Sequence, residues 1–183
     1  MGFDDYYKTG KDFAHIENIK ELVSIAESLM DRKIQNALDI GCGTGELLEQ
    51  LNLLGIQATG IDTSKIALEK AKKRNVIALY ADMETPYEGT YDIIFSKLSL
   101  AFAKDKRLVL SHVYSALKNG GVFVLITPIL LGNCLYKREK IKNISIPKRE
   151  LEQMLKDTFN MFAVHAIELF DEDGIQITYI MQK

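Results

Sequence analysis

The sequence predicts an α/β fold in which a mostly parallel sheet carries helices on both faces. Short apolar segments alternate along the chain with segments whose apolar residues recur every three or four positions, a pattern typical of parallel strands joined by crossover helices. Two apolar segments joined by Asp171-Glu172-Asp173-Gly174 close the chain, and we expect an antiparallel hairpin there. Because crossovers are right-handed, the loops after the parallel strands should share one edge of the sheet, where such folds bind ligands.

The expected elements are placed by apolar spacing and by the turn residues between them. Helices are expected at 12–30, 44–54, 64–74, 104–117 and, opened by Pro147, to about Asp157. Strands are expected at 36–40, 57–61, 76–80, 91–96, 122–127, 161–169 and 175–181. We expect Thr63 or Ser64 to cap the helix at 64–74, Asn119-Gly120-Gly121 to end the helix at 104–117, and Pro128 to end the fifth strand.

Length and composition indicate one globular domain. The 183 residues are 47% hydrophobic and 26% charged, which are ordinary values for a folded protein, and the formal net charge of −2 indicates no class of partner. Cys42 and Cys134 form no CxxC pair, so neither a disulfide framework nor a metal site is expected. We expect a cytoplasmic protein, because the first residues are acidic and aromatic and no apolar run is long enough to span a bilayer.

A glycine-rich turn follows the expected strand at 36–40, with glycine at positions 41, 43 and 45. Glycine permits positive φ and lets a ligand approach the backbone, and the next helix begins with free N–H groups. Glu46 stands where a dinucleotide-binding loop has its third glycine, and a carboxylate there would repel a diphosphate. Asp39, two residues before the loop, suits a cationic ligand. For an isolated glycine loop, the alternative is a tight turn that binds nothing.

Two further acidic residues follow the next two expected strands. Asp62 comes 21 positions after Gly41, and its two oxygens can accept from both hydroxyls of a ribose. Asp82 can accept from the exocyclic amine of adenine while the N–H of Met83 donates to a ring nitrogen. These positions indicate an adenosine-containing ligand. The alternatives are a helix N-cap for Asp62 and a turn residue for Asp82.

These motifs resemble those of the class I S-adenosylmethionine-dependent methyltransferases, which have a Rossmann-like fold. The resemblance rests on the segments 37–48, 60–64, 81–83, 91–96 and 117–124. It implies a doubly wound seven-stranded sheet of order 3-2-1-4-5-7-6 with strand 7 antiparallel. We expect a single domain over 1–183, made of an N-terminal helical cap at 1–33, a cofactor-binding core at 35–128, and a substrate-side loop, helix and hairpin at 129–183.

The resemblance also implies how S-adenosylmethionine would be held. This ligand carries an ammonium and a sulfonium and no phosphate, which agrees with a carboxylate at Asp39. The backbone at Gly41 and Gly43 would hold the methionine part, and Tyr7 would close over it, with a frayed terminus as the alternative. The expected cofactor contacts are Tyr7, Asp39, Gly41, Cys42, Gly43, Asp62, Thr63, Ala81, Asp82, Met83 and Ser96.

The methyl acceptor is less constrained. We expect Tyr6 and Lys97 in its site, with a solvated lysine as the alternative for Lys97. No residue is assigned a catalytic role, because transfer from a sulfonium mainly requires alignment and exclusion of water. His112 lies on the apolar side of its helix and is expected in the core. No Asn/Asp-Pro-Pro-Tyr element follows the fourth strand, so the family's base-amine and glutamine methylation motif is missing.

The segment 137–149 is basic, and it can either attract an anionic acceptor, including RNA, or form a solvated loop. Over the stretch 128–148 the charged residues are Lys137, Arg138, Lys140, Lys142 and Lys148 against Glu139 alone. We expect a methyltransferase acting on a small molecule. The alternatives are an RNA- or protein-directed methyltransferase that uses this segment, a non-catalytic domain that binds the cofactor, and a nicotinamide-dependent oxidoreductase, which Glu46 and Asp39 disfavour.

Overall fold

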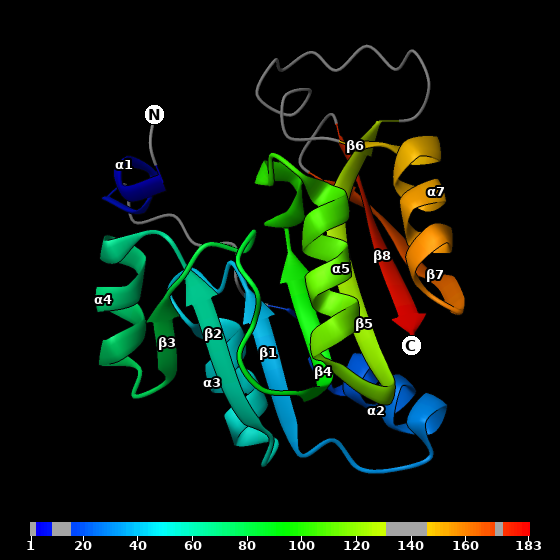
Figure 1. Cartoon of the computed structure of the whole chain (residues 1–183). Coiled ribbons are helices and arrows are strands. Elements are labelled where there is room, and N and C mark those ends of the chain that lie inside the picture. Colours follow the sequence, from blue (N-terminus) through cyan, green and yellow to red (C-terminus); the bar gives the residue numbers. More distant parts are fainter. Residues whose placement is uncertain (1–2, 9–15, 131–145, 171–173) are drawn as a thin grey trace.

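The computed structural model describes residues 3–8, 16–130, 146–170 and 174–183, and its strands form one twisted sheet (Figure 1). Along the sheet lie β3 (Ile77–Tyr80), β2 (Gln57–Asp62), β1 (Asn36–Ile40), β4 (Tyr91–Lys97), β5 (Leu117–Leu130), β8 (Gly174–Gln182) and β7 (Met161–Phe170). β8 is antiparallel to both of its neighbours. This order and the antiparallel β8 confirm the prediction, and the two-residue β6 (Ile146–Pro147), which pairs with the end of β5, was not predicted.

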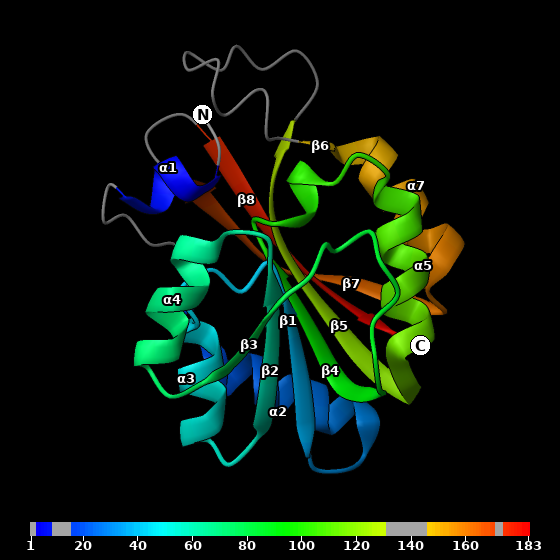
Figure 2. The same ribbon diagram turned by 60° about the vertical axis from the view of Figure 1, so that its left-hand side comes forward.

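Helices cover both faces of the sheet (Figures 1 and 2). The helices are α1 (Phe3–Lys8), α2 (Ile19–Met30), α3 (Glu46–Leu53), α4 (Lys65–Lys73), the 3-10 turn η1 (Leu100–Phe102), α5 (Lys106–Ala116) and α7 (Lys148–Thr158). α2 and α3 pack on one face with strand residues such as Ala37 and Phe95. α5 and α7 pack on the other face with Leu38 and Ile94. Adjacent strand residues thus point to opposite clusters, as the pleat of a buried sheet requires.

The junction of α5 and β5 differs from the prediction. α5 ends at Ala116, and β5 begins at once with Leu117, which pairs with Tyr91 of β4. The glycines at 120 and 121 therefore lie inside a strand, and a Cβ at Gly121 would approach the backbone oxygens of Lys118, Tyr91 and Asp92 within 3.2 Å. Gly121 permits close passage of two backbones, a role that sequence alone does not distinguish from a helix end.

Pro128 does not end β5, contrary to the prediction, because the strand continues to Leu130. β4 ends at Lys97, opposite Ile126 of β5. Two residues further along, the missing N–H of the proline costs no hydrogen bond to β4, because that neighbour has already ended. β8 still pairs with β5 there, with Gln176 opposite Pro128.

The first predicted helix is shorter than expected, since α2 begins at Ile19 and residues 9–15 lie outside the described residues. Ile16 is buried and exchanges hydrogen bonds with the side chain of Gln50 on α3, which fixes the approach of the chain to α2. In the described part of the chain, no helix is long and apolar enough to cross a membrane. The cytoplasmic location and the division into three segments stay predictions.

Candidate functional site

The glycine loop joins β1 to α3 at the carboxyl end of the central strands. Gly41, Gly43 and Gly45 all have positive φ, of 76°, 52° and 79°, a conformation that side chains with a Cβ adopt at a cost. The N–H groups of Gly41 and Cys42 donate to the backbone oxygen of Ile61, at 2.8 and 2.9 Å. The loop is therefore held against the end of β2, with little room for movement of its first half.

Each of these glycines is also closely approached by another part of the chain. An ideal Cβ at Gly41 would lie 2.3 Å from Cβ of Ser99, and one at Gly43 would lie 2.6 Å from the hydroxyl of Tyr7. A Cβ at Gly45 would lie 2.7 Å from Val76. The loop thus brings together the end of β1, the segment after β4 and the N-terminal helix, which are far apart in sequence.

Asp62 ends β2 and binds the loop through its carboxylate. Its Oδ2 accepts from the N–H of Gly43 at 2.8 Å, and its Oδ1 accepts from the N–H of Ser64 at 2.7 Å. Ser64 itself caps α4 by accepting from the N–H of Ala67, so the alternative of Asp62 as the N-cap is wrong. Each oxygen of a carboxylate has a second lone pair, and a ribose could still be bound.

Asp39 is a buried carboxyl group in β1, only 3% exposed. Burial and, to a lesser extent, the nearby charge of Asp62 raise the pKa of Asp39 to about 8, and Lys97 acts against both. Burial likewise raises the pKa of Asp62. Two carboxyl groups with raised pKa values stand beside a loop of backbone N–H groups. A cationic ligand group placed there would lower both pKa values and favour the ionised carboxylates.

Asp82 forms the turn that was its alternative interpretation. Its Oδ1 accepts from the N–H of Glu84 at 2.9 Å, and its backbone oxygen accepts from Thr85. Glu84 in turn accepts from the N–H groups of Lys104 and Asp105 ahead of α5. These bonds fix the backbone around Met83. The second carboxylate oxygen of Asp82 has lone pairs that can accept a hydrogen bond from an adenine amine.

The segment after β4 is fixed by a chain of hydroxyl groups. The hydroxyl of Ser99 donates to the backbone oxygen of Ile40, so Ser96 donates to Ser99, at 2.7 Å between their Oγ atoms, and accepts from the N–H of Leu100. Leu98 adopts φ 62°, an uncommon conformation for leucine that this anchoring supports. The hydroxyl of Ser96 therefore holds Ser99 against the loop, a contact that the local sequence around Ser99 does not indicate.

The other predicted site residues fall into three groups. The hydroxyl of Tyr7 lies against Gly43, and Lys97 lies close enough to act on the pKa of Asp39. The side chain of Cys42 packs in the core against Gly60, so a contact from Cys42 would come from its backbone. Thr63 and Ala81 flank Asp62, and the N–H of Ala81 donates to the backbone oxygen of Asp62 at 3.2 Å.

Several residues predicted to lie on the acceptor side are outside the described part of the chain. The side chain of Tyr6 is one of them, and so are Lys137, Arg138, Lys140 and Lys142 of the basic segment. Lys148 is described, and it forms an ion pair with Glu152 one turn along α7, at 2.8 Å. His112 was expected in the core, but it is half-buried and packs edge-on against Tyr87. Its buried Nδ1 has no hydrogen-bond partner among the described residues.

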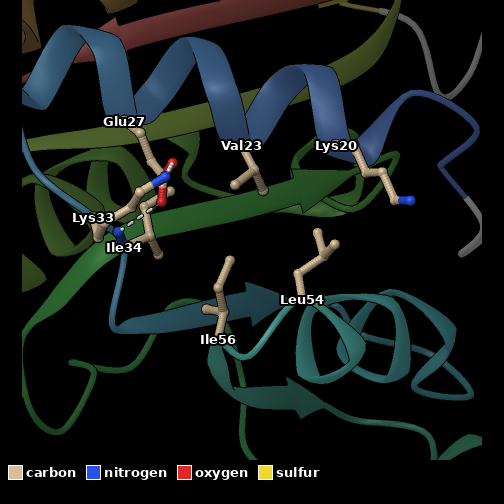
Figure 3. A pocket seen from close by; sticks show the side chains of 7 residues that line it. All are labelled: Lys20, Val23, Glu27, Lys33, Ile34, Leu54 and Ile56. Atoms are coloured by element: carbon tan, nitrogen blue, oxygen red, sulfur yellow. Dashed lines mark hydrogen bonds and ion pairs between the residues drawn. The ribbon is translucent and has the colours of Figure 1, made fainter.

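A pocket of about 390 Å³ lies elsewhere, between α2 and the end of α3 (Figure 3). Its apolar walls include Val23, Leu54 and Ile56, and Lys33 at its rim pairs with Glu27 at 2.6 Å. Ile56 directly precedes β2, whereas Asp62 ends it. The pocket is therefore at the opposite edge of the sheet from the glycine loop, and it plays no part in the candidate site.

A doubly wound sheet with a glycine loop after β1 and carboxylates at the end of β2 and after β3 defines a Rossmann-like domain, in which ligands bind at this edge of the sheet. The chain belongs to the methyltransferase-domain family, whose model matches residues 31–182. This match covers every described strand of the sheet.

Similar proteins differ in the reaction that their names state. The malonyl-[acyl-carrier protein] O-methyltransferase of Salmonella typhimurium is 26% identical over 159 residues, which are 80% of this chain and 63% of that protein. The human mitochondrial arginine-hydroxylase NDUFAF5 is 33% identical over 107 residues, which are 55% of this chain and 31% of that protein. The chain thus spans less than two thirds of the length of both relatives.

A solved structure shows the same fold. The plantazolicin methyltransferase BamL, in complex with a triazolic desmethylPZN analog and SAH, superposes with a TM-score of 0.71 at 18% identity. The match covers 90% of this chain and 83% of that chain. At this level of identity the likeness concerns the path of the backbone.

Proposed function

We propose that this protein is an S-adenosylmethionine-dependent methyltransferase that acts on a small molecule. The observation that carries the proposal is the pair of carboxyl groups beside the glycine loop, the buried Asp39 and the half-buried Asp62. A diphosphate is repelled by such a pair, whereas an amino acid ammonium and a sulfonium are attracted to it. Membership of the methyltransferase-domain family supports the same ligand.

In this proposal each part of the site binds one part of the ligand. The backbone at Gly41 and Gly43 holds the methionine part with Asp39 behind it, Asp62 accepts from the ribose, and Asp82 with Met83 binds adenine. The cofactor supplies an activated methyl group. Tyr7 covers the loop and Ser99 lies against it, so these residues exclude water and align the acceptor, which is where the rate increase of such a transfer arises.

The proposed acceptor is a small molecule that enters beside Lys97 and the segment after β4. The similarity to a malonyl-[acyl-carrier protein] O-methyltransferase supports an acyl or carboxylate acceptor, and a lysine at this edge would attract a carboxylate. The described residues assign no general base. An ionised carboxylate requires none, since its reactive oxygen carries no proton.

Calorimetry with S-adenosylmethionine and its demethylated product tests the proposal. We expect binding in the micromolar range, no binding of NAD, and a loss of at least about tenfold in affinity for Asp62→Ala, which removes charged hydrogen bonds to the ribose. Asp157→Ala on the exposed surface of α7 is the matched control. Incubation with methyl-labelled cofactor and fractionated cell extract should then move the label into a small molecule.

The outcomes separate the competing functions. Binding of NAD without binding of S-adenosylmethionine would overturn the proposal in favour of an oxidoreductase. Binding of the cofactor with no transfer of label from any fraction would contradict methyl transfer, and it would agree with a binding domain or with a different reaction such as the one named for the hydroxylase relative. Label in RNA or protein would contradict a small-molecule acceptor.

A second prediction concerns the protonation of Asp39. With a pKa of about 8, this group is mostly protonated at pH 7 in the free protein. An ammonium placed beside it favours the carboxylate, so binding should release close to one proton at pH 7. Affinity should therefore rise as the pH increases from 6 to 8 and level off above that value.

Calorimetry of S-adenosylhomocysteine binding in two buffers of different ionisation enthalpy measures this release. The observed enthalpies should differ by the difference between the buffers, and Asp39→Asn should remove that dependence. Equal enthalpies in the two buffers for the wild-type protein would show that Asp39 does not change its protonation on binding.

A further inference from the structure

The N-terminal helix α1 lies beside α4 (Figures 1 and 2), and three hydrogen bonds fasten it there. Oδ1 of Asp4 accepts from the hydroxyl of Ser64 at 2.6 Å and from the N–H of Ile66 at 3.4 Å. The ammonium of Lys70 donates to the backbone oxygen of Tyr7 at 2.6 Å. The hydrogen bond from Ser64 lowers the pKa of Asp4, so this carboxylate is ionised at neutral pH. A six-residue helix is not stable alone, and these contacts determine where α1 lies.

The same contacts connect α1 to the glycine loop. Ser64, which binds Asp4 through its hydroxyl, donates its N–H to Asp62, and Asp62 accepts from Gly43. On the other side of this network, the hydroxyl of Tyr7 lies directly on Gly43. A continuous set of hydrogen bonds thus leads from Asp4 to the loop that Tyr7 covers.

We propose that α1 is a clasp that closes the cofactor site, and that the contacts of Asp4 and Lys70 set how fast the cofactor enters and leaves. The inference rests on the proposed function. Tyr7 covers the backbone over which the methionine part would lie, so a ligand reaches Gly43 only when α1 detaches from α4. Asp4 and Lys70 are positioning residues in this scheme, because they touch α1 and α4 and not the ligand.

The clasp has a kinetic consequence that distinguishes it from ordinary structural support. If α1 must detach for both entry and exit, weaker fastening raises the association rate as well as the dissociation rate. The equilibrium dissociation constant then changes less than either rate. Substitution of a residue that only stabilises the bound state would raise the dissociation rate alone.

The test compares Asp4→Ala with Asp5→Ala. Both substitutions remove one carboxylate from the same helix, but the carboxylate of Asp5 pairs with Lys8 on the exposed side. Binding of S-adenosylhomocysteine is followed by surface plasmon resonance, with each protein attached through a C-terminal tag. We expect Asp4→Ala to raise both rates about fivefold, as loss of one charged hydrogen bond near the surface permits. Asp5→Ala should behave as wild type.

A second pair of variants tests the other fastening. Lys70→Met removes the bond to Tyr7 and should also raise both rates, whereas Lys73→Met, in the exposed last turn of α4, should not. Hydrogen exchange of residues 3–8 without ligand should be faster in Asp4→Ala than in Asp5→Ala, which reports detachment of α1 independently of binding.

Two results would overturn the clasp. An association rate for Asp4→Ala equal to or below that of Asp5→Ala would show that α1 does not control entry, although the protein binds the cofactor. If wild-type protein binds neither S-adenosylmethionine nor its product, the proposed function fails and the clasp fails with it. The exchange measurement would then report only whether Asp4 attaches α1 to α4.

Discussion

Gly41→Ala should lower the affinity for S-adenosylhomocysteine by about a hundredfold, the scale expected when a ligand-holding loop is displaced by about 1 Å. The new Cβ would lie 2.3 Å from Cβ of Ser99 and 3.0 Å from its hydroxyl. Ser99 cannot easily move aside, because its hydroxyl is bound to the backbone of Ile40 and to Ser96. The φ of 76° at position 41 adds about 1–2 kcal/mol of strain for any residue with a Cβ. The glycine loop therefore has to shift.

Gly55→Ala is the matched control for this substitution. Gly55 has nearly the same φ, 80°, but an added Cβ there would meet nothing within 4 Å. It follows α3, at the end of the sheet opposite to the candidate site. We expect a similar cost in the free energy of unfolding from the backbone strain, with unchanged affinity.

Calorimetric titration of both variants, together with their thermal unfolding, measures the two effects separately. An affinity of Gly41→Ala within threefold of the wild-type value would show that the ligand does not depend on the loop. An equal loss of affinity in Gly55→Ala would attribute the effect to general destabilisation.

The sequence was most informative where one residue type has one physical purpose. The glycines at 41, 43 and 45 indicated positive φ, and all three have it. The alternation of apolar segments predicted the sheet and its closing hairpin, because strands buried on both faces leave a nearly continuous apolar pattern. For the same reason β4 was placed within one residue of its observed end.

The sequence was least informative where a residue acts through a distant partner. Asp4 and Ser99 carry no local signal, and their roles depend on where α1 and the segment after β4 are placed by the whole fold. The start of β5 was misassigned because Gly120 and Gly121 follow a helix in sequence, although Gly121 serves the close passage of β5 beside β4. Which ligand atoms the predicted contacts meet stays a prediction.

The two buried aspartates of the central strands show how the sheet separates binding from stability. Asp39 lies near the carboxyl end of β1, where burial and the nearby charge of Asp62 raise its pKa to about 8. Asp92 lies near the amino end of β4 and is 1% exposed, yet it is surrounded by donors. Asp39 makes the folded state less stable as the pH rises from about 4 to 8, because the unfolded chain ionises first. Asp92 has a lowered pKa, so it should make the folded state more stable as the pH rises toward about 4, with no further change above that value.

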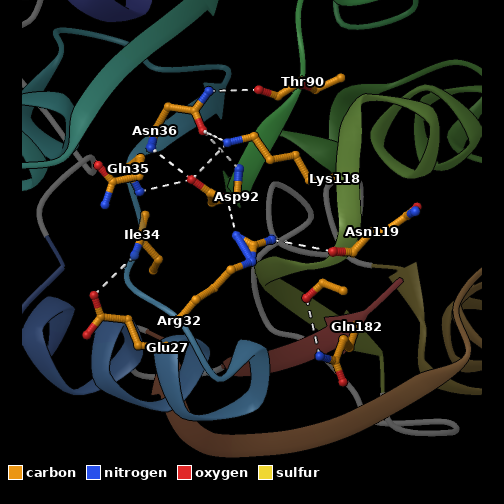
Figure 4. A network of polar contacts seen from close by, with 11 residues as sticks. Glu27, Arg32, Ile34, Gln35, Asn36, Thr90, Asp92, Lys118, Asn119 and Gln182 are labelled. Atoms are coloured by element: carbon orange, nitrogen blue, oxygen red, sulfur yellow. Dashed lines mark hydrogen bonds and ion pairs between the residues drawn. The ribbon is translucent and has the colours of Figure 1, made fainter.

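The donors around Asp92 come from two separate parts of the chain, residues 32–36 and Lys118 (Figure 4). Arg32 donates to its Oδ1, the N–H groups of Gln35 and Asn36 donate to its Oδ2 at 2.9 and 3.2 Å, and the ammonium of Lys118 lies 3.1 Å from Oδ2. Burial alone would raise the pKa of Asp92, but these hydrogen bonds outweigh burial and lower it. The carboxylate thus ties the start of β1 and the start of β5 to β4.

Asp92→Ala should lower the free energy of unfolding at pH 7 by about 3 kcal/mol, since it leaves two cations and two backbone N–H groups without their acceptor. This value is at the low end for a buried pair because Arg32 and Lys118 are each more than one third exposed. Asp157→Ala removes a carboxylate that is paired with Arg107 on the exposed surface, and it should change the stability far less.

Urea unfolding as a function of pH gives the sign of the effect. Because the folded pKa of Asp92 is lowered, its contribution is complete above the unfolded pKa near 4 and is lost as the pH falls through the folded pKa. The difference between wild type and Asp92→Asn should therefore be constant from pH 6 to 8 and shrink below about pH 4. A difference that grows on acidification would contradict a lowered pKa. A difference that persists unchanged at low pH would mean that the donors bind the side-chain oxygens without regard to their charge.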